Sequence, residues 1–197
     1  MDSVLSSGSR TASTKIVIAG GFGVGKTTLV GSVSEIVPLR TEALVTNESE
    51  GVDDLASTPG KSTTTVAMDF GRITLAEDLV LYLFGTPGQK RFWFMWDDLV
   101  RGAIGAIVLV DTNRLDAAFA PLDYFESKSV PFIVAVNEFE GGAKYPLNEI
   151  AEALALPADV PLITVDARDR ASAKRALVRI TEFALTRLAT AQRKAVI

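Results

Sequence analysis

Short runs of apolar residues recur along the chain and are separated by polar or amphipathic stretches. Continuous apolar runs of about four to eight residues are typical of strands that are covered on both faces, as in parallel sheets. The runs that we predict to be strands lie at residues 16–19, 66–73, 79–84, 105–110, 132–136 and 162–165. Only a few polar residues separate the second run from the third, which indicates a hairpin. The pattern predicts a mostly parallel sheet of about six strands.

Helical spacing of apolar residues fills the gaps between these runs. Its clearest instance is the last segment, where the apolar positions are Ala173, Ala176, Leu177, Ile180, Phe183, Ala184 and Leu188. This spacing predicts an amphipathic closing helix. Further helices are expected over residues 29–36 and, with a less regular pattern, around residues 147–155. Strands that alternate with helices predict an α/β fold with helices on both faces of the sheet.

Two polar stretches lie outside this pattern. Residues 40–62 lack strong periodicity, and a stretch of this length inside a compact domain is usually functional or disordered. Residues 1–13 are rich in Ser, Gly and Thr and contain no apolar signal segment, so we expect a disordered N-terminal tail. The globular domain is then expected to span residues 14–197.

Composition narrows the chemistry that the chain can perform. Its 197 residues are 48% hydrophobic, which is enough for one domain with a full core. A net charge of −4 argues against nonspecific binding of nucleic acid. The chain has no cysteine and no histidine, which excludes disulfides, thiolate metal sites, a lipid anchor through cysteine and the commonest general base. No apolar run approaches the roughly 20 residues of a membrane span.

The strongest motif follows the first predicted strand, at residues 20–28 (Gly-Gly-Phe-Gly-Val-Gly-Lys-Thr-Thr). It has the P-loop spacing of Gly, four residues and Gly-Lys-Thr, and it lies between a strand and a helix, as that motif requires. Glycines and a helix N-terminus present backbone N–H groups to phosphate oxygens. The phosphate-binding candidates are Gly21, Gly23, Val24, Gly25, Lys26, Thr27 and Thr28. In this motif Lys26 reaches the terminal phosphates and the Thr27 hydroxyl binds Mg²⁺.

Two further segments resemble the switch elements of small GTPases. Thr65 lies four residues before Asp69-Phe70, which is the spacing of switch I, where a threonine binds Mg²⁺. The alternative is a threonine-rich start of a strand. Gly88 and Gln89 end the sequence Gly-Thr-Pro-Gly-Gln, which resembles switch II and has a plain turn as its alternative. In switch II, Gly88 would contact the γ-phosphate through its backbone and Gln89 would orient the attacking water.

Three features near these segments change the picture. An aspartate normally holds Mg²⁺ through water where this chain has Gly85, so an expected carboxylate is missing. Asp111 ends an apolar run in the manner of a Walker B aspartate, and it is either the metal-binding residue of a P-loop ATPase or a cap. Residues 92–96 (Phe-Trp-Phe-Met-Trp) form either core or a partner surface, because five bulky residues cannot all face inward from one helix.

The ends of the last two predicted strands carry candidates for recognition of the base. Asn137 and Glu140 stand where guanine-specific GTPases have Asn-Lys-x-Asp, with Glu138 in place of the lysine. The Glu140 carboxylate can accept hydrogen bonds from two guanine N–H groups, and adenine would leave it unpaired. The alternative is an ordinary acidic loop. Asp166, Ala167 and Arg168 stand where GTPases have Ser-Ala-Lys, so the Ala167 N–H is a candidate partner of guanine O6.

With all these elements in order from residue 15 to about residue 188, the chain resembles small Ras-like GTPases. It is similar to the bacterial MglA-like group and, in Gly-Thr-Pro-Gly-Gln, Arg-Phe-Trp-Phe-Met-Trp and Asn-x-Phe-acidic, to conservon (CvnD-type) GTPases of actinobacteria. The resemblance implies a P-loop NTPase fold and a cytoplasmic GTP/GDP switch that uses Mg²⁺. It also implies a roadblock (MglB-like) regulator, a sensor-like histidine kinase and recruitment to a membrane-associated complex. Phe22 departs from the family, since Ras-like proteins have a small residue there and its bulk could obstruct an arginine finger.

We therefore expect a molecular switch with slow, partner-stimulated hydrolysis of GTP. Lys26 and Gln89 are the catalytic candidates. Thr27 and Thr65 are the candidate Mg²⁺ ligands. Two alternatives stay open: a nucleotide-binding module that does not hydrolyse, and a P-loop ATPase that uses Asp111. The closing helix is basic in an acidic chain, and a solvated face or a docking surface for an acidic partner or membrane accounts for that charge.

Overall fold

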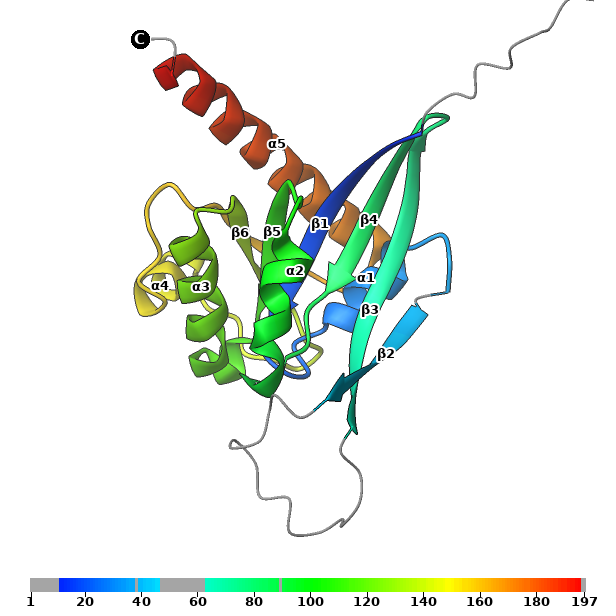
Figure 1. Ribbon diagram of the computed structural model, residues 1–197. Coiled ribbons are helices and arrows are strands. Elements are labelled where there is room, and N and C mark those ends of the chain that lie inside the picture. The colour runs from blue at the N-terminus through cyan, green and yellow to red at the C-terminus, as the bar shows by residue number, and fades with distance from the viewer. Residues whose placement is uncertain (1–10, 38, 47–62, 89, 196–197) are drawn as a thin grey trace, which may run out of the picture.

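The structure is a computed structural model that describes residues 11–37, 39–46, 63–88 and 90–195. Within these ranges seven strands form one sheet in the order β2-β3-β4-β1-β5-β6-β7 (Figure 1). The strands are β1 (Ala12–Gly20), β2 (Leu39–Thr46), β3 (Thr63–Ala76), β4 (Leu79–Gly85), β5 (Gly105–Val110), β6 (Phe132–Asn137) and β7 (Leu162–Val165). β3 is antiparallel to both of its neighbours, and the other neighbouring pairs are parallel. The predicted mostly parallel α/β fold is confirmed.

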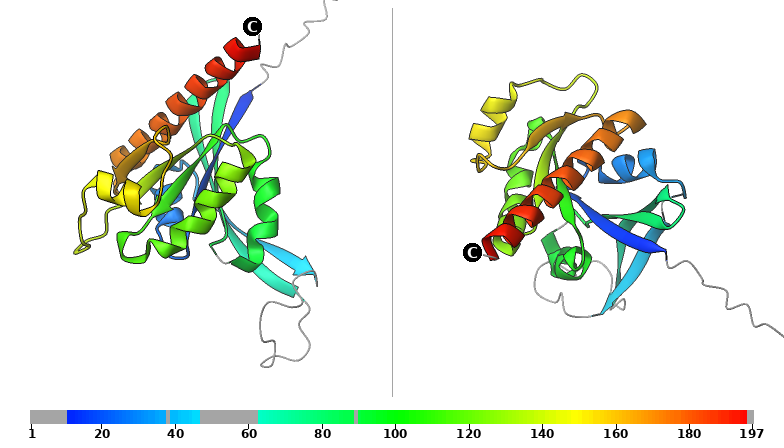
Figure 2. Two further views of the ribbon diagram at one scale, coloured as in Figure 1. Left: turned by 90° about the vertical axis from the view of Figure 1, so that its left-hand side faces the viewer. Right: turned by 90° about the horizontal axis from the view of Figure 1, so that it is seen from above.

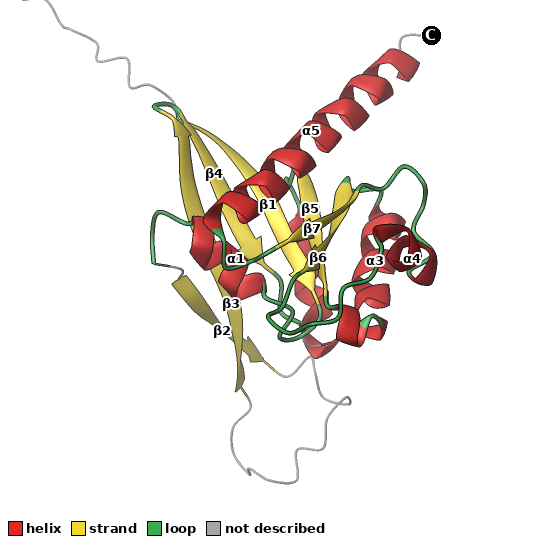
Figure 3. Cartoon of the chain, turned by 180° about the vertical axis from the view of Figure 1, so that it is seen from behind, coloured by secondary structure: helices red, strands yellow, loops and turns green. Residues whose placement is uncertain are grey.

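Helices cover both faces of this sheet (Figures 1 and 3). They are α1 (Lys26–Val33), α2 (Trp96–Val100), α3 (Asp116–Lys128), α4 (Leu147–Ala153) and α5 (Arg170–Ala195), with 3-10 turns η1 (Lys90–Met95) and η2 (Thr112–Arg114). One apolar cluster joins the sheet to α1 and α5, and a second joins it to α2, α3 and α4. The C-terminal half of α5 extends past the strands (Figure 2). None of the helices in the described ranges has the length and apolar character to cross a membrane.

The central strand β1 shows why its sequence is continuously apolar. Ile16 and Ile18 pack in the cluster with α1 and α5, whereas Val17 and Ala19 pack in the cluster on the opposite face. All four side chains are fully buried. Successive side chains of a strand point to opposite faces. The part of β1 that is covered by helices on both sides is therefore apolar at consecutive positions.

The structure differs from the sequence-based expectation in three element boundaries. β2 overlaps the stretch 40–62 that we expected to be functional or disordered, and it brings the sheet to seven strands. It pairs with β3 over Leu39–Thr46, and its sequence contains no continuous apolar run of four residues that would have marked it as a strand. β1 begins at Ala12, two residues inside the predicted tail; residues 1–10 lie outside the described ranges. Helix α1 begins at Lys26, earlier than expected.

Candidate functional site

The P-loop connects the carboxyl end of β1 to the start of α1. β1 lies between β4 and β5 in the sheet and is parallel to both. The segments that follow these three strands therefore begin at the same edge of the sheet. Gly25 immediately precedes α1 with a φ of 106°, which favours glycine. A Cβ atom at this position would lie 2.5 Å from the Asn137 Nδ2 atom. Glycine at position 25 thus permits both the turn and the close approach of β6.

Lys26 is buried in the loop that it helps to shape. Its Nζ atom donates hydrogen bonds to the carbonyl oxygens of Gly20 at 2.8 Å and Gly21 at 2.7 Å. Burial lowers the pKa of Lys26 to about 8, and the nearby Asp69 carboxylate opposes this shift. The ammonium group is therefore held inside the loop, at the place where phosphate oxygens would meet it.

A cavity of about 370 Å³ opens beside this lysine. Its lining residues come from the P-loop, from β3 and from the segment after β4, and they are Phe22, Gly23, Gly25, Lys26, Thr27, Thr28, Asp69, Thr86, Pro87 and Gly88. Gly88 lies close to the loop, because a Cβ atom there would be 2.9 Å from the Phe22 backbone and 3.0 Å from Lys26 Nζ. Phe22 is 70% exposed at this cavity. The cavity joins the predicted phosphate cradle to the first residues of the predicted switch II.

Asp69 is a site residue that the sequence analysis missed. Its Oδ2 atom accepts a hydrogen bond of 2.7 Å from the Thr27 hydroxyl. Asp69 pairs directly with Gly85 across the β3–β4 ladder, and a Cβ atom at Gly85 would lie 2.9 Å from Asp69 Cβ and 3.0 Å from Oδ2. Opposed residues of an antiparallel pair share one face of the sheet. The carboxylate that is absent at Gly85 is thus supplied from the neighbouring strand.

The donor atoms at Thr27 and Asp69 fit a magnesium ion that is shared with phosphate. Mg²⁺ prefers oxygen ligands and, at nucleotide sites, uses one or two protein carboxylates together with phosphate oxygens and water. The Thr27 hydroxyl and the Asp69 carboxylate face the same cavity. In the described part of the chain no group of three or more acidic, histidine or cysteine side chains could hold a metal unaided. A metal here would need the phosphates of a nucleotide.

Asn137 holds together three segments at the edge of the site. Its Nδ2 atom donates to the Val24 carbonyl oxygen of the P-loop at 2.9 Å, and its Oδ1 atom accepts from the Ala167 backbone N–H at 3.0 Å. The side chain is buried at the end of β6. Both polar ends of this amide, and the Ala167 N–H, are therefore engaged within the protein. Asn137 thus links the P-loop to the loop after β7, beside the predicted base site.

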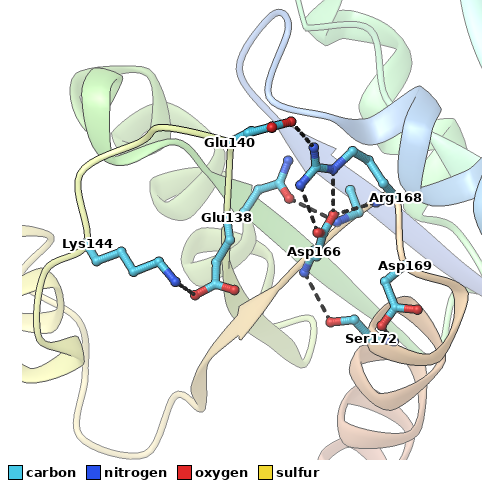
Figure 4. Close-up of polar contacts among 9 residues, drawn as sticks. Glu138, Glu140, Lys144, Asp166, Arg168, Asp169 and Ser172 are labelled. Carbon is cyan, nitrogen blue, oxygen red and sulfur yellow. Dashed lines mark hydrogen bonds and ion pairs between the residues drawn. The ribbon is translucent and has the colours of Figure 1, made fainter.

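Charged side chains from two loops lie around the predicted base site (Figure 4). Arg168 donates from Nε and Nη2 to the two oxygens of Asp166 at 3.0 and 2.9 Å, and from Nη1 to Glu140 Oε2 at 3.4 Å. Glu138 instead faces Lys144, with 3.7 Å between Oε1 and Nζ. The hydrogen bond from Arg168 lowers the pKa of Asp166 to about 2. Asp166 is a second residue of this region that the sequence analysis did not single out as a candidate.

Asp111 acts as a cap in this structure. Its Oδ1 atom accepts from the Asn113 backbone N–H at 3.0 Å, and its Oδ2 atom accepts from Arg114 Nε and Nη2 at 3.1 and 3.0 Å. It therefore starts η2 and neutralises an arginine. Asp111 is absent from the lining of the cavity at Lys26. Of its two interpretations from sequence, the cap describes these contacts.

The aromatic segment after β4 divides between core and surface. Phe92 and Trp96 are buried, and the Trp96 ring packs against Trp93 and Tyr124. Phe94 points outward and is 53% exposed.

Two residues that the sequence predicts for the site are not placed relative to the cavity at Lys26. Gln89 lies outside the described residues, and Thr65 is described only as a strand position of β3.

The sequence of this chain is similar to the sequences of several known proteins. The chain is 31% identical over 132 residues to the uncharacterized protein MJ1339 of Methanocaldococcus jannaschii, which covers 65% of this chain and 71% of the relative. It is 24% identical over 183 residues to the Ras-related protein Rab-7b of Homo sapiens, covering 88% of this chain and 83% of the relative. The Ras-related protein RABD2c of Arabidopsis thaliana is 26% identical over 136 residues, which cover 64% of this chain and 67% of that protein.

Solved structures show the same fold at low sequence identity. The FeoB G-domain from Methanococcus jannaschii aligns with a TM-score of 0.56 and 13% identity over 87% of this chain and 98% of its own. The G domain of the T. maritima FeoB iron transporter aligns with a TM-score of 0.59 and 18% identity over 88% and 99%. The fold is thus that of a P-loop G domain. A family model described as conserved hypothetical ATP binding protein matches residues 18–187. The chain belongs to this family of conserved hypothetical ATP-binding proteins.

Proposed function

We propose that the chain is a GTP/GDP-binding molecular switch that hydrolyses GTP slowly with Mg²⁺. The observation that carries the proposal is the hydrogen bond between Thr27 and Asp69 inside the cavity of the P-loop. It places a hydroxyl and a carboxylate, the groups that a nucleotide-bound Mg²⁺ requires, next to a buried lysine. In this function Lys26 neutralises phosphate charge, and Thr27 and Thr65 bind the metal.

The catalytic part of the proposal rests on the segment after β4. The Gly88 backbone would contact the γ-phosphate and Gln89 would orient the attacking water, as in other GTPases. Phe22 supports a slow reaction. Phe22 lines the cavity and is exposed, and its ring would obstruct an arginine supplied by a partner, a group that contributes about 10³- to 10⁵-fold to GTP hydrolysis. If the ring blocks hydrolysis altogether, the chain is a nucleotide-binding module.

The partners belong to the same proposal. The similarity to MglA-like and conservon GTPases supports a roadblock (MglB-like) regulator and a histidine kinase as partners, in a complex at the membrane. The exposed Phe94, which lies beside the switch segment, supports a surface on which such a regulator would act. A regulator bound there would sense the nucleotide through the segment that follows Gly88.

ATP is the second candidate nucleotide. It is favoured by the family description and by the state of the base site, where the Ala167 N–H is already bonded to Asn137. This contact must rearrange or widen for the Ala167 N–H to bind guanine O6 as in other GTPases. An adenine-binding site would leave it as it is. Asp111, which the ATPase interpretation used, is engaged with Arg114.

Nucleotide competition followed by single-turnover kinetics tests the proposal. We expect GDP to displace labelled GTP at stoichiometric concentrations and ATP only at large excess, and phosphate to be released slowly from bound GTP. Lys26→Ala should abolish binding, because it removes the buried cation, whereas Lys174→Ala on the exposed side of α5 should bind normally. Equal displacement by ATP would replace GTP by ATP in the proposal. No phosphate release over many hours would leave a binding module.

A further inference from the structure

Three charged groups from two loops form a row at the base site. Glu140 follows β6, and Asp166 and Arg168 follow β7 (Figure 4). The Arg168 guanidinium lies between the two carboxylates and donates to each of them. Without it, the two carboxylates would repel one another at the same edge of the site. Arg168 therefore joins the loop after β6 to the loop after β7.

The pairing of Arg168 with Asp166 fixes the plane of the guanidinium. Two parallel N–H···O bonds form a fork, and this arrangement restricts orientation more than a single contact does. Asp166 is anchored in turn. It accepts the Arg168 backbone N–H at 2.9 Å and donates its own N–H to the buried Ser172 hydroxyl of α5 at 3.1 Å. The third donor of the guanidinium, Nη1, is thus aimed at Glu140 from a supported position.

The contact with Arg168 leaves the Oε1 atom of Glu140 available as an acceptor. Among the described residues, Glu140 accepts a hydrogen bond from Arg168 through Oε2 alone, and the Glu140 side chain is 91% exposed. The three groups together keep one negative charge. A guanine ring presents two adjacent N–H donors on one edge, which match such a carboxylate. An adenine ring presents an acceptor nitrogen beside its amino group on the corresponding edge and would face the carboxylate with a lone pair.

We propose that Arg168, anchored by Asp166, is a positioning residue that orients the Glu140 carboxylate toward the two N–H donors of a guanine ring. This inference rests on the proposed function, since it requires a nucleotide in the P-loop site. Asn137 links the two regions, because its bonds to Val24 and Ala167 fix the loop after β7 relative to the P-loop. The row of charges therefore stands at a defined place relative to the phosphates. Ras-like GTPases have serine and lysine at these two positions. This chain has Asp166 and Arg168 instead, and their side chains form a hydrogen-bonded pair.

Binding of GTP, inosine triphosphate and ATP to matched variants tests the inference. Arg168→Ala should weaken GTP binding about 2- to 5-fold, the range for losing an ion pair between exposed side chains, and should leave ATP binding unchanged. Inosine triphosphate lacks the 2-amino group of guanine and should lose less affinity than GTP. Asp166→Asn should act in the same direction, and Arg168→Lys should give an intermediate loss because it keeps the charge but not the fork. Arg175→Ala, an exposed basic change on α5, is the control.

The outcomes separate this inference from the function beneath it. If Arg168→Ala weakens GTP, inosine triphosphate and ATP equally, Arg168 acts on the phosphates or on folding, and the inference is overturned. Unchanged GTP affinity overturns it as well. A wild-type chain that prefers ATP overturns the inference while nucleotide binding survives. A wild-type chain that binds no nucleotide overturns the proposed function itself, and this is seen before any variant is compared.

Discussion

In the proposed function, Asp69 and Gly85 divide between them a role that one aspartate fills in Ras-like GTPases. Gly85 supplies only space, and Asp69 fills that space from the opposite strand with a carboxylate that accepts the Thr27 hydroxyl. Neither residue can be understood alone. A side chain at position 85 would collide with Asp69, and without Asp69 the cavity would hold no carboxylate among its described lining residues.

Moving the carboxylate across the ladder tests this division. Asp69→Ala should make nucleotide retention about 10- to 100-fold less dependent on Mg²⁺, the usual effect of losing a group that supports a metal ligand. Gly85→Asp alone should also impair retention, because the new side chain meets Asp69 Cβ. The double variant Asp69→Gly/Gly85→Asp should recover retention. Dissociation rates of labelled nucleotide with Mg²⁺ and with a chelator measure all three, and a double variant no better than either single one contradicts the account.

Lys26 makes a pH dependence of binding measurable. Burial lowers the pKa of Lys26 to about 8, and bound phosphate raises it again by favouring the charged form. Below pH 8 the lysine is already protonated, so affinity should not change with pH. Above pH 8 binding requires uptake of a proton, and affinity should fall by up to about tenfold per pH unit. Lys26→Arg stays charged and should not show this fall in affinity. Ionisation of the base affects both proteins alike, so the difference between the two profiles reports on Lys26. A flat wild-type profile from pH 7 to 9.5 contradicts the prediction.

At the scale of elements, the sequence was most informative where strands are covered on both faces. The predicted strand at residues 105–110 coincides with β5, and the one at 132–136 ends one residue before β6 does. β2 was missed because its sequence, Leu-Arg-Thr-Glu-Ala-Leu-Val-Thr, contains no continuous apolar run of four residues. A different limit hid Asp69. A linear motif search compares neighbours in sequence, whereas Asp69 and Gly85 are neighbours only through the pairing of β3 with β4.

The element after the switch segment should tolerate substitution very unevenly. Trp96 is 1% exposed and packs against Tyr124 and Phe125 of α3, so Trp96→Ala should lower the free energy of unfolding by about 3–5 kcal/mol. Trp96→Phe should cost far less, because it keeps an aromatic ring and removes an indole N–H that has no partner among the described residues. Phe94→Ala should change stability by less than about 0.5 kcal/mol. Urea unfolding measures each change, and equal effects at positions 94 and 96 would contradict the assignment.

At the scale of the whole molecule, one amide connects the parts that a nucleotide would bridge. Asn137 stands 113 residues from Val24 and 30 from Ala167 in sequence, and it bonds to both. The sequence singled out residues 137–140 and the residues after β7 as candidates for the base site, but it did not show which contacts each of them makes. Sequence spacing indicates which loops meet at the end of a sheet. It does not reveal that both the Nδ2 and the Oδ1 atom of Asn137 form hydrogen bonds to the backbone of those loops.

Loss of this amide should weaken the fold as well as the site. Asn137→Ala leaves the Val24 carbonyl and the Ala167 N–H without their partner, and we expect it to lower the free energy of unfolding by about 2–5 kcal/mol. Asn113→Ala is a matched control, since Asn113 is exposed and donates only through its backbone. Thermal and urea unfolding without nucleotide isolate the structural effect. If Asn137→Ala unfolds with the same free energy as the wild-type chain, the two hydrogen bonds of Asn137 contribute little to stability.

The pairing of Asp69 with Gly85 also constrains how such a chain can change over generations. A lineage with its carboxylate on β3 cannot gain one on β4 while Asp69 remains, because the two side chains compete for the same space. A lineage that first loses Asp69 passes through an ancestor with neither acid. Both single steps are thus disfavoured, and only the paired exchange restores the site. Related chains should therefore keep the aspartate on the strand where their common ancestor had it, either on β3 or on β4.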